Sequence, residues 1–206
     1  MLDRRLRAAF DRPLRAVAGR LGEQRVGAET VTVVGFALGA GACVAIAFDQ
    51  RWLALVLWLA NRIADGLDGA VARLVGATDR GGFVDIVADF AVYAGFVVGV
   101  AYAQPDARLA AVVVLAAYYV SGAAFLAWSS LAERRARTSG DNRSLHFVGG
   151  LAEGGETVVV YVLVCVWPGA TVAILWAFAA AVSVTALQRV RFGWRALSDH
   201  DGGADR

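Results

Sequence analysis

Four aspartates form two pairs whose spacing suits the binding of metal ions. Asp65 and Asp68 lie three residues apart, and Asp85 and Asp89 lie four residues apart. On helices, each of these spacings places both side chains on one face. Two facing helices would therefore direct four carboxylates to one point. Carboxylate oxygens are the ligands that hard divalent cations prefer, so the pattern indicates a site for a pair of such cations.

The segments around these aspartates have the composition of a membrane protein. The chain of 206 residues is 58% hydrophobic, whereas soluble domains are usually about 45–50% apolar. A carboxylate in the bilayer costs roughly 2.5–3.5 kcal/mol on insertion scales, so four of them need partners such as metal ions or phosphates. We therefore expect an integral membrane protein rather than a soluble helical bundle, and no nucleic-acid partner.

Six apolar stretches predict an all-α fold, a bundle of six transmembrane helices in one domain that spans residues 1–206. Most of them reach the about 20 residues that a helix needs to cross the hydrocarbon core. They cover residues 30–48, 52–75, 83–103, 109–131, 146–167 and 170–187. The fifth is the weakest, because its purely apolar part is short. Glu153 and Glu156 would then lie either at membrane depth, lining a polar cavity, or at the interface.

The two ends of the chain are predicted to differ from this bundle. In residues 1–25, the large apolar side chains fall on one side of a helical wheel and arginines on the other, with a kink at Pro13. This pattern is typical of an amphipathic helix that lies in the membrane interface. Residues 198–206 are polar and contain glycine, and we expect a disordered tail there.

The arginines indicate which side of the membrane holds the aspartates. All 20 basic residues are arginine, and the connections on the side opposite to the termini hold only Arg51 and Arg108. By the positive-inside rule, both termini face the cytoplasm and the number of spans is even. The aspartate site would then lie near the cytoplasmic face, and we expect the cytoplasmic membrane of a bacterium.

Two pairs of glycines predict close helix packing. Gly35 with Gly39, and Gly95 with Gly99, have the GxxxG spacing that lets helices approach closely. In a chain with 23 glycines such pairs often arise by chance. We therefore interpret them as packing within one chain, and a homodimer is left open.

Small residues and an arginine follow the first aspartate pair and suit a phosphorylated ligand. Gly69 and Ala72 share a helical face with Asp65, so they leave a slot in which a ligand can approach the backbone. Arg73 lies beside this slot, and its guanidinium fork matches the geometry of a phosphate. Carboxylates, an arginine and a slot together indicate a diphosphate site, at which two metal ions would neutralise the charge.

The segment from Asp65 to Asp89 resembles the signature of the CDP-alcohol phosphatidyltransferases, D-x2-D-G-x2-A-R-x8-G-x3-D-x3-D. The six-span layout with an amphipathic helix in front is also similar to that family. One departure is that seven residues, where the usual pattern has about eight, separate Arg73 from Gly81. This connection is predicted to be a loop, where a deletion is tolerated.

The resemblance implies a metal-dependent transfer of a phosphatidyl group from a CDP-lipid, CDP-diacylglycerol, to a small polar alcohol, with release of CMP. Asp65, Asp68 and Asp85 would hold one divalent cation, Mg²⁺ or Mn²⁺. Asp65, Asp85 and Asp89 would share a second. Asp89 would also act as the general base on the acceptor hydroxyl. The implied contacts to the cytidine diphosphate part of the donor are Asp65, Gly69, Ala72, Arg73 and Thr78.

Two groups of charged residues favour different acceptor alcohols. An arginine cluster after the fourth apolar stretch would attract a phosphorylated alcohol, although the positive-inside signal also accounts for it. Glu153 and Glu156 would instead suit an amino alcohol or a polyol, and we favour such an acceptor because glutamates at membrane depth are costly. His146 heads the fifth stretch, where it could contact a substrate. The arginine cluster consists of Arg134, Arg135, Arg137 and Arg143.

Two other functions compete with this interpretation. A prenyltransferase resembling the UbiA family would also bind a diphosphate through metal ions, and Asn61 with Asp65 superficially fits its first motif, but that family has more spans. A divalent-cation transporter could use the aspartates as a pathway, but Arg73 would repel the cation. Asn61 and Arg62 lie one turn before Asp65, where they either bond to neighbouring helices or orient Asp65. Asp79 is interpreted as a solvated residue or a helix N-cap.

Overall fold

The computed structural model describes residues 14, 16–21, 27–139 and 154–201, and within them it contains helices and no strand. This confirms the all-α fold. Two short 3-10 helices, Pro105–Ala107 and Pro168–Ala170, join consecutive α-helices. The long helices are α2 (Ala28–Ala47), α3 (Arg51–Val75), α4 (Asp79–Ala103), α5 (Arg108–Ser139), α6 (Gly154–Val166) and α7 (Thr171–Asp201).

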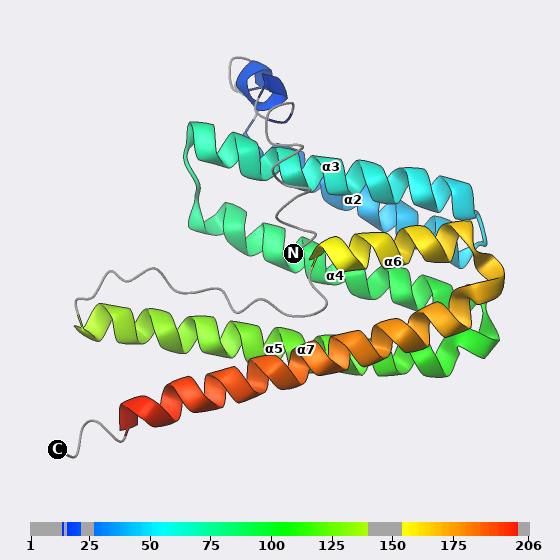
Figure 1. Cartoon of the computed structure of the whole chain (residues 1–206). Helices are drawn as coiled ribbons and strands as arrows, with labels where there is room; N and C mark the ends of the chain where they lie inside the picture. The colour runs from blue at the N-terminus through cyan, green and yellow to red at the C-terminus, as the bar shows by residue number, and fades with distance from the viewer. Residues whose placement is uncertain (1–13, 15, 22–26, 140–153, 202–206) are drawn as a thin grey trace.

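The helices form two packed groups, which are joined by α6 and by contacts between α4 and α5. Helix α2 packs extensively against α3 and α4, and α5 packs along α7, while α6 contacts both α3 and α7. Figure 1 shows the α2–α3, α4–α5 and α6–α7 connections together at one end of the bundle. The α3–α4 connection and the carboxyl ends of α5 and α7 lie at the other end. We call this second end the arginine-rich end, because Arg80, Arg134 and Arg195 belong to it.

Aromatic rings fill the centre between α3, α4 and α6. Trp58, Phe96 and Tyr161 are almost fully buried. The Phe96 and Tyr161 rings stack with centroids 4.3 Å apart, and the Trp58 ring lies 4.8 Å from that of Tyr161. Such pairs contribute about 0.5–1.5 kcal/mol beyond the burial of their area. This cluster holds α3 and α4 in a fixed relation next to the aspartates.

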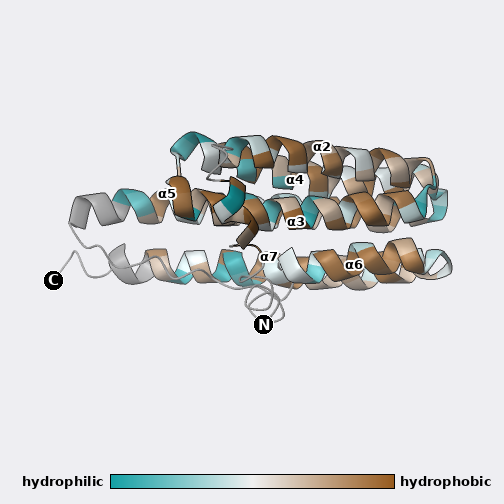
Figure 2. Ribbon diagram, turned by 90° about the horizontal axis from the view of Figure 1, so that it is seen from above, coloured by the Kyte–Doolittle hydropathy of each residue, from teal (hydrophilic) through white to brown (hydrophobic). Residues whose placement is uncertain are grey.

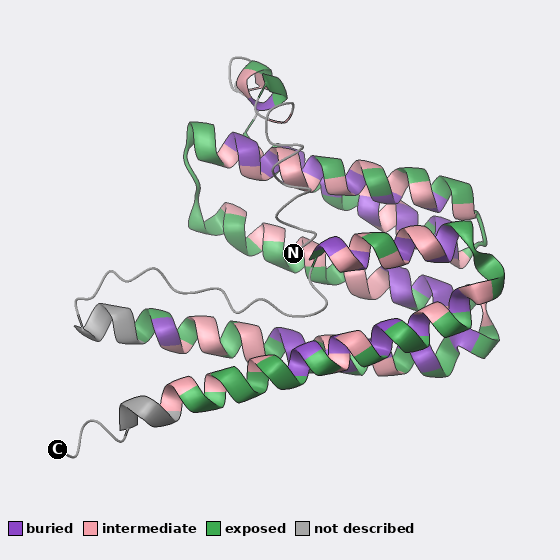
Figure 3. Ribbon diagram, viewed as in Figure 1, coloured by how far each residue is buried: buried purple, intermediate pink, exposed green. Residues whose placement is uncertain are grey.

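The outer surface of the bundle is apolar, as a lipid-facing surface should be. Hydrophobic residues, brown in Figure 2, occur along all the labelled helices, and many residues of the same helices are exposed, green in Figure 3. Large side chains such as Trp52 and Tyr119 are 70% and 80% exposed. Soluble monomers rarely leave contiguous apolar surface of this extent uncovered. With the hydropathy of the helices, this supports an integral membrane protein.

Four segments are long and apolar enough to cross a membrane: Ala28–Ala47, Asp79–Ala103, Pro105–Arg134 and Pro168–Leu197. Helix α3 falls outside this set although it is 25 residues long, and it carries Arg62, Asp65, Asp68 and Arg73. Helix α6 has 13 described residues and begins at Gly154, so Glu153 and His146 lie outside the described residues. The count of six spans therefore stays a prediction.

The ends of the chain agree with the sequence analysis only in part. Residues 14 and 16–21 are helical, and Ala18 is buried in a small cluster with Ala70 and Val71 of α3. Most of the predicted amphipathic helix, including Pro13, lies outside the described residues. At the other end, α7 continues to Asp201. The expected disordered tail over 198–206 is therefore wrong for residues 198–201, which extend the last helix.

The glycine pairs confirm close packing within the chain. A Cβ atom at Gly39 would lie 2.6 Å from Val92 Cγ2 of α4 and 2.9 Å from Asn61 Nδ2 of α3. A Cβ atom at Gly99 would lie 2.6 Å from the carbonyl oxygen of Cys43. Real Cβ atoms do not approach other atoms so closely, so only glycine allows these helices to meet. Helix α2 is thereby drawn against the two helices that carry the aspartates.

Candidate active site

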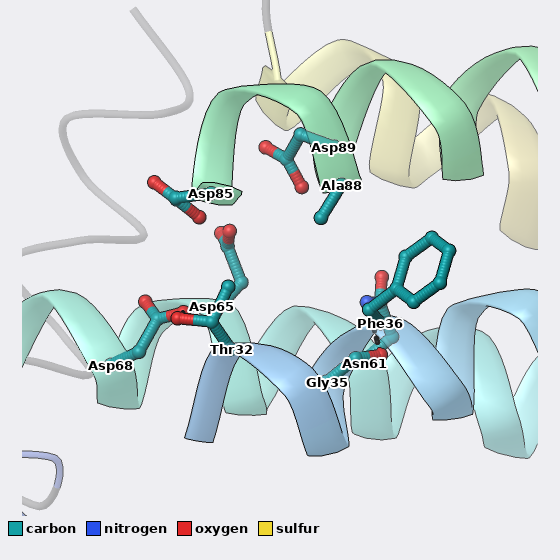
Figure 4. Close-up of a pocket in the computed structure, with 9 residues that line it drawn as sticks. All are labelled: Thr32, Gly35, Phe36, Asn61, Asp65, Asp68, Asp85, Ala88 and Asp89. Carbon is teal, nitrogen blue, oxygen red and sulfur yellow. Dashed lines mark hydrogen bonds between the residues drawn. The ribbon is translucent and has the colours of Figure 1, made fainter. Parts of the chain in front are cut away.

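The two aspartate pairs meet where α2, α3 and α4 come together. Asp65 and Asp68 project from α3, and Asp85 and Asp89 project from α4 toward them (Figure 4). One oxygen from each of Asp65, Asp68 and Asp85 lies within 4.8 Å of the others. Oxygens on opposite sides of an ion bound at 2.0–2.6 Å are about 4–5 Å apart. The donor set therefore fits a hard divalent cation, and the predicted meeting of the carboxylates is confirmed for these three.

The short α3–α4 connection sets the register of the two helices. Gly76 ends α3 with φ 113°, a conformation that favours glycine. Thr78 then caps α4, because its hydroxyl accepts a hydrogen bond of 3.0 Å from the Gly81 N–H. Of the two interpretations of Asp79, the solvated residue is confirmed and the N-cap is wrong, since Asp79 is exposed as the first residue of α4 and Thr78 before it is the N-cap. This tight turn places Asp85 opposite the carboxyl-terminal half of α3.

Helix α2 supplies a hydroxyl that holds one aspartate. Thr32 Oγ1 donates a hydrogen bond of 2.7 Å to Asp68 Oδ2. Both residues are buried, so this short bond to a carboxylate lies away from water. Thr32 was not among the predicted site residues, because a threonine in an apolar helix carries no local signal of its partner.

Arg62 connects the second aspartate pair to the neighbouring polar residues. Its Nη2 donates to Asp89 Oδ1 at 2.7 Å, and its Nη1 donates to the Tyr93 hydroxyl at 2.7 Å. Asp65 Oδ2 lies farther away, 3.6 Å from Nη1. The Asn61 side-chain oxygen accepts from Nε and Nη2 at 2.9 and 2.7 Å. Arg62 thus bonds to the next helix and contacts Asp65 only through a longer ion pair.

The carboxylates line a pocket that a ligand can reach. The side chains of Asp65 and Asp89 are 35% and 30% exposed, although Asp68 is buried. Helix α2 contributes Phe36 to the wall, and α4 contributes Ala88 (Figure 4). The complete lining is Thr32, Gly35, Phe36, Asn61, Asp65, Asp68, Asp85, Ala88 and Asp89. The combination of apolar wall and convergent carboxylates is typical of a binding site.

Of the residues expected to contact a nucleotide, Asp65 belongs to this lining, and the other four lie beyond it, toward the carboxyl end of α3. Gly69 and Ala72 are partly buried, and Arg73 is exposed in the last turn. Arg73 Nη1 lies 3.4 Å from the position of a Cβ atom at Gly69, so the guanidinium folds back over the glycine. Thr78 instead caps α4, and its hydroxyl also donates to Glu29 Oε1 at 3.4 Å. Their role toward a nucleotide stays a prediction.

The residues considered for the acceptor are described only in part. Arg134 is exposed on α5, and Glu156 is partly buried in the first turn of α6. Arg135 and Arg137 belong to α5, but their side chains lie outside the described part. Arg143, His146 and Glu153 also fall outside it. The choice between a phosphorylated and an uncharged or zwitterionic acceptor is therefore untested.

Known proteins share both the sequence pattern and the fold. A family model described as CDP-alcohol phosphatidyltransferase matches residues 25–187. The chain is 37% identical over 203 residues to the inner membrane protein YnjF of Escherichia coli (strain K12), covering 96% of this chain and 97% of that protein.

Two similar crystal structures are of phosphatidylinositol phosphate synthase from Mycobacterium tuberculosis. The one with CDP-DAG bound has a TM-score of 0.71 at 21% identity, covering 89% of this chain and 94% of that chain. The other, a complex with manganese and citrate, has a TM-score of 0.70 at 22% identity, covering 88% of each chain. At this level of identity the likeness concerns the fold.

Proposed function

This chain belongs to the CDP-alcohol phosphatidyltransferase family, and we propose that it transfers a phosphatidyl group from CDP-diacylglycerol to the hydroxyl of a small polar alcohol. The observation that carries the proposal is the convergence of oxygens from Asp65, Asp68 and Asp85 within 4.8 Å of one another in a pocket of an apolar bundle. A carboxylate cluster at this place is costly unless it binds cations. A similar fold has been crystallised with CDP-DAG, which supports a CDP-lipid as the donor.

The carboxylates would hold divalent cations, Mg²⁺ or Mn²⁺. Asp65, Asp68 and Asp85 fit one such ion by the spacing of their oxygens. Asp65, Asp85 and Asp89 are the residues proposed for a second. Bound ions would neutralise the diphosphate of the donor and stabilise the departing phosphate. The structure of the Mycobacterium tuberculosis enzyme with manganese supports metal binding in this fold.

The protein's own residues would then orient the reactants and move one proton. Asp89 accepts the proton of the acceptor hydroxyl as the acceptor oxygen bonds to the β-phosphorus of the donor. The bond from that phosphorus to the oxygen bridging the two phosphates breaks, and CMP leaves with the bridging oxygen. Arg73 at the rim offers a guanidinium fork to the diphosphate, with Gly69 and Ala72 leaving room for the nucleotide and Thr78 at its edge.

The proposed membrane arrangement follows from the position of the site in the bundle. The aspartates belong to the carboxyl-terminal half of α3 and the amino-terminal half of α4. These halves lie toward the arginine-rich end, where α5 and α7 also end (Figure 1). The positive-inside rule assigns this end to the cytoplasm. We include α3 and α6 among six spans, with the helix around Ala18 at the interface, packed against Ala70 and Val71 of α3. The lipid donor would enter laterally, and a polyol or zwitterionic acceptor would enter from the cytoplasm.

The test is the release of CMP by the purified protein. The protein is incubated with CDP-diacylglycerol and Mg²⁺ and with each of a panel of polar alcohols, phosphorylated and unphosphorylated. CMP that appears only with one alcohol identifies the acceptor, and removal of metal with a chelator should stop the reaction. Pyrophosphate release from a prenyl diphosphate would instead indicate a prenyltransferase. Transport of a divalent cation across the membrane without CMP release would indicate a transporter.

A further inference from the structure

Arg62 is held more firmly than a membrane-surface arginine usually is. Its side chain is 11% exposed, and the guanidinium carbon lies 4.8 Å from the Trp58 ring centre and 5.0 Å from that of Tyr93. The Asn61 amide that accepts from it is itself fixed, because its Nδ2 donates to the Gly35 carbonyl oxygen at 2.8 Å. The guanidinium is therefore a permanent positive charge at the edge of the carboxylate cluster rather than a mobile side chain.

This charge lies where a second metal ion would share ligands. Asp89 Oδ1 is 2.7 Å from Arg62 Nη2, and Asp65 Oδ2 is 3.6 Å from Nη1. Among the described residues, Arg62 makes no ion pair within 4.0 Å with Asp68 or Asp85, and these two carboxylates can join Asp65 around one ion. The cluster thus divides into a set of three carboxylates that fits an ion and a fourth that is already paired.

We infer that the free protein holds one divalent ion tightly, at Asp65, Asp68 and Asp85, and that Arg62 supplies on Asp89 the positive charge that a second ion would otherwise provide. This rests on the proposed function. A second dication bound about 2 Å from Asp89 Oδ1 would lie on the order of 5 Å from the guanidinium, and Coulomb repulsion even at the dielectric constant of water weakens its binding about tenfold.

A second consequence concerns the position of the proton acceptor. Because Arg62 engages Oδ1 of Asp89, Oδ2 is the oxygen that the described contacts leave for the acceptor hydroxyl. Arg62 acts here as a positioning residue: it fixes the carboxylate without touching the reacting atoms. The Tyr93 hydroxyl, which accepts from Nη1, holds the guanidinium from the other side.

The experiment counts bound Mn²⁺ by electron paramagnetic resonance on the purified full-length protein without donor. The variant Arg62→Met replaces the guanidinium with a neutral side chain of similar length. At Mn²⁺ concentrations at which this variant binds two ions, wild type should bind one. The second ion should bind Arg62→Met at least about tenfold more tightly than wild type. Arg62→Lys keeps the charge and should behave as wild type. Arg51→Met is the matched control, because Arg51 pairs with Asp49 at the other end of α3.

Several outcomes overturn the inference. If wild type binds two Mn²⁺ ions with similar affinity, the inference is wrong, whatever the variants do. The wild-type measurement therefore decides the question even if a variant fails to fold. If Arg62→Met folds and binds the same number of Mn²⁺ ions as wild type, the role of Arg62 is merely structural. The same conclusion follows if Arg62→Met and Arg62→Lys lose thermal stability equally while their Mn²⁺ binding is unchanged. In both cases, metal-dependent CMP release would leave the proposed function standing. Wild type that binds no Mn²⁺ overturns the proposed metal site as well.

Discussion

Replacement of Thr32 with valine is expected to weaken metal binding at the aspartate cluster about 10–100-fold. The Thr32 hydroxyl donates a 2.7 Å hydrogen bond to Asp68 Oδ2 in a buried position. Hydrogen bonds to charged groups contribute about 1.5–3 kcal/mol, and a free-energy change of this size corresponds to a change in metal affinity of roughly 10–100-fold. Valine has almost the volume of threonine, so the change removes the bond and leaves the packing of α2. Asp68 then loses the contact that aims it at the oxygens of Asp65 and Asp85.

The assay is a Mn²⁺ titration followed by electron paramagnetic resonance, with the metal dependence of CMP release measured in parallel. The metal concentration for half-maximal activity should rise by the same factor as the dissociation constant, whereas the rate at saturating metal should change little. Thr32→Ser retains the hydroxyl and should remain close to wild type. An unchanged dissociation constant in Thr32→Val, or an equal loss in Thr32→Ser, would refute the role of this hydrogen bond.

Three further predictions concern the site and its scaffold. Asp85→Asn should abolish metal-dependent CMP release without lowering the thermal midpoint, since it removes a charge and little volume; retained turnover would contradict the metal role. Gly39→Ala should lower the free energy of unfolding by about 1–3 kcal/mol, because its Cβ would meet Val92, whereas Gly82→Ala, with open space around it, serves as control in thermal unfolding. Arg73→Ala should raise the KM for CDP-diacylglycerol more than it lowers kcat, and an unchanged KM in steady-state kinetics would argue against a phosphate contact.

Local patterns were enough to predict the helices and the meeting of the carboxylates. Apolar length indicated where each of the six main helices runs, and the i, i+3 and i, i+4 spacings fixed which face carries the aspartates. The glycine pairs were also interpreted correctly as packing within the chain, since Gly39 and Gly99 each meet another helix of the same protein. These features depend on residues that are close together in the sequence, so the spacing of those residues is enough to predict them.

Contacts between helices could not be predicted in the same way. Thr32 reaches Asp68 across 36 positions, and Arg62 reaches Asp89 across 27. Both depend on how each helix is rotated about its axis, which the sum of many packing contacts decides. The sequence signal for Arg62 was present, a cation at membrane depth one turn before Asp65. Bonding to a neighbouring helix was one of the two interpretations of Arg62 and is confirmed, but the sequence did not identify Asp89 of α4 as its partner.

Helix ends were the other weak point, because single residues decide them. Thr78 and Asp79 are both good capping types, and the side chain whose oxygen reaches the Gly81 N–H proved to be Thr78. At the carboxyl terminus, polar residues after Leu197 indicated a tail, yet α7 continues to Asp201. Polar composition describes a solvated surface as well as a disordered segment, so composition alone does not separate the two.

The charge of the site links metal binding to donor binding. The four aspartates and Arg62 give the described cluster a formal net charge of −3. One divalent ion leaves it negative, which would repel the diphosphate of the donor at short range. A donor that arrives adds further negative charge next to Asp89, and this offsets the repulsion that Arg62 exerts on a second ion. Donor and second ion should therefore bind with positive coupling, each raising the affinity for the other by the same factor. If Arg62 acts as we infer, full ion occupancy should therefore depend on the presence of the donor.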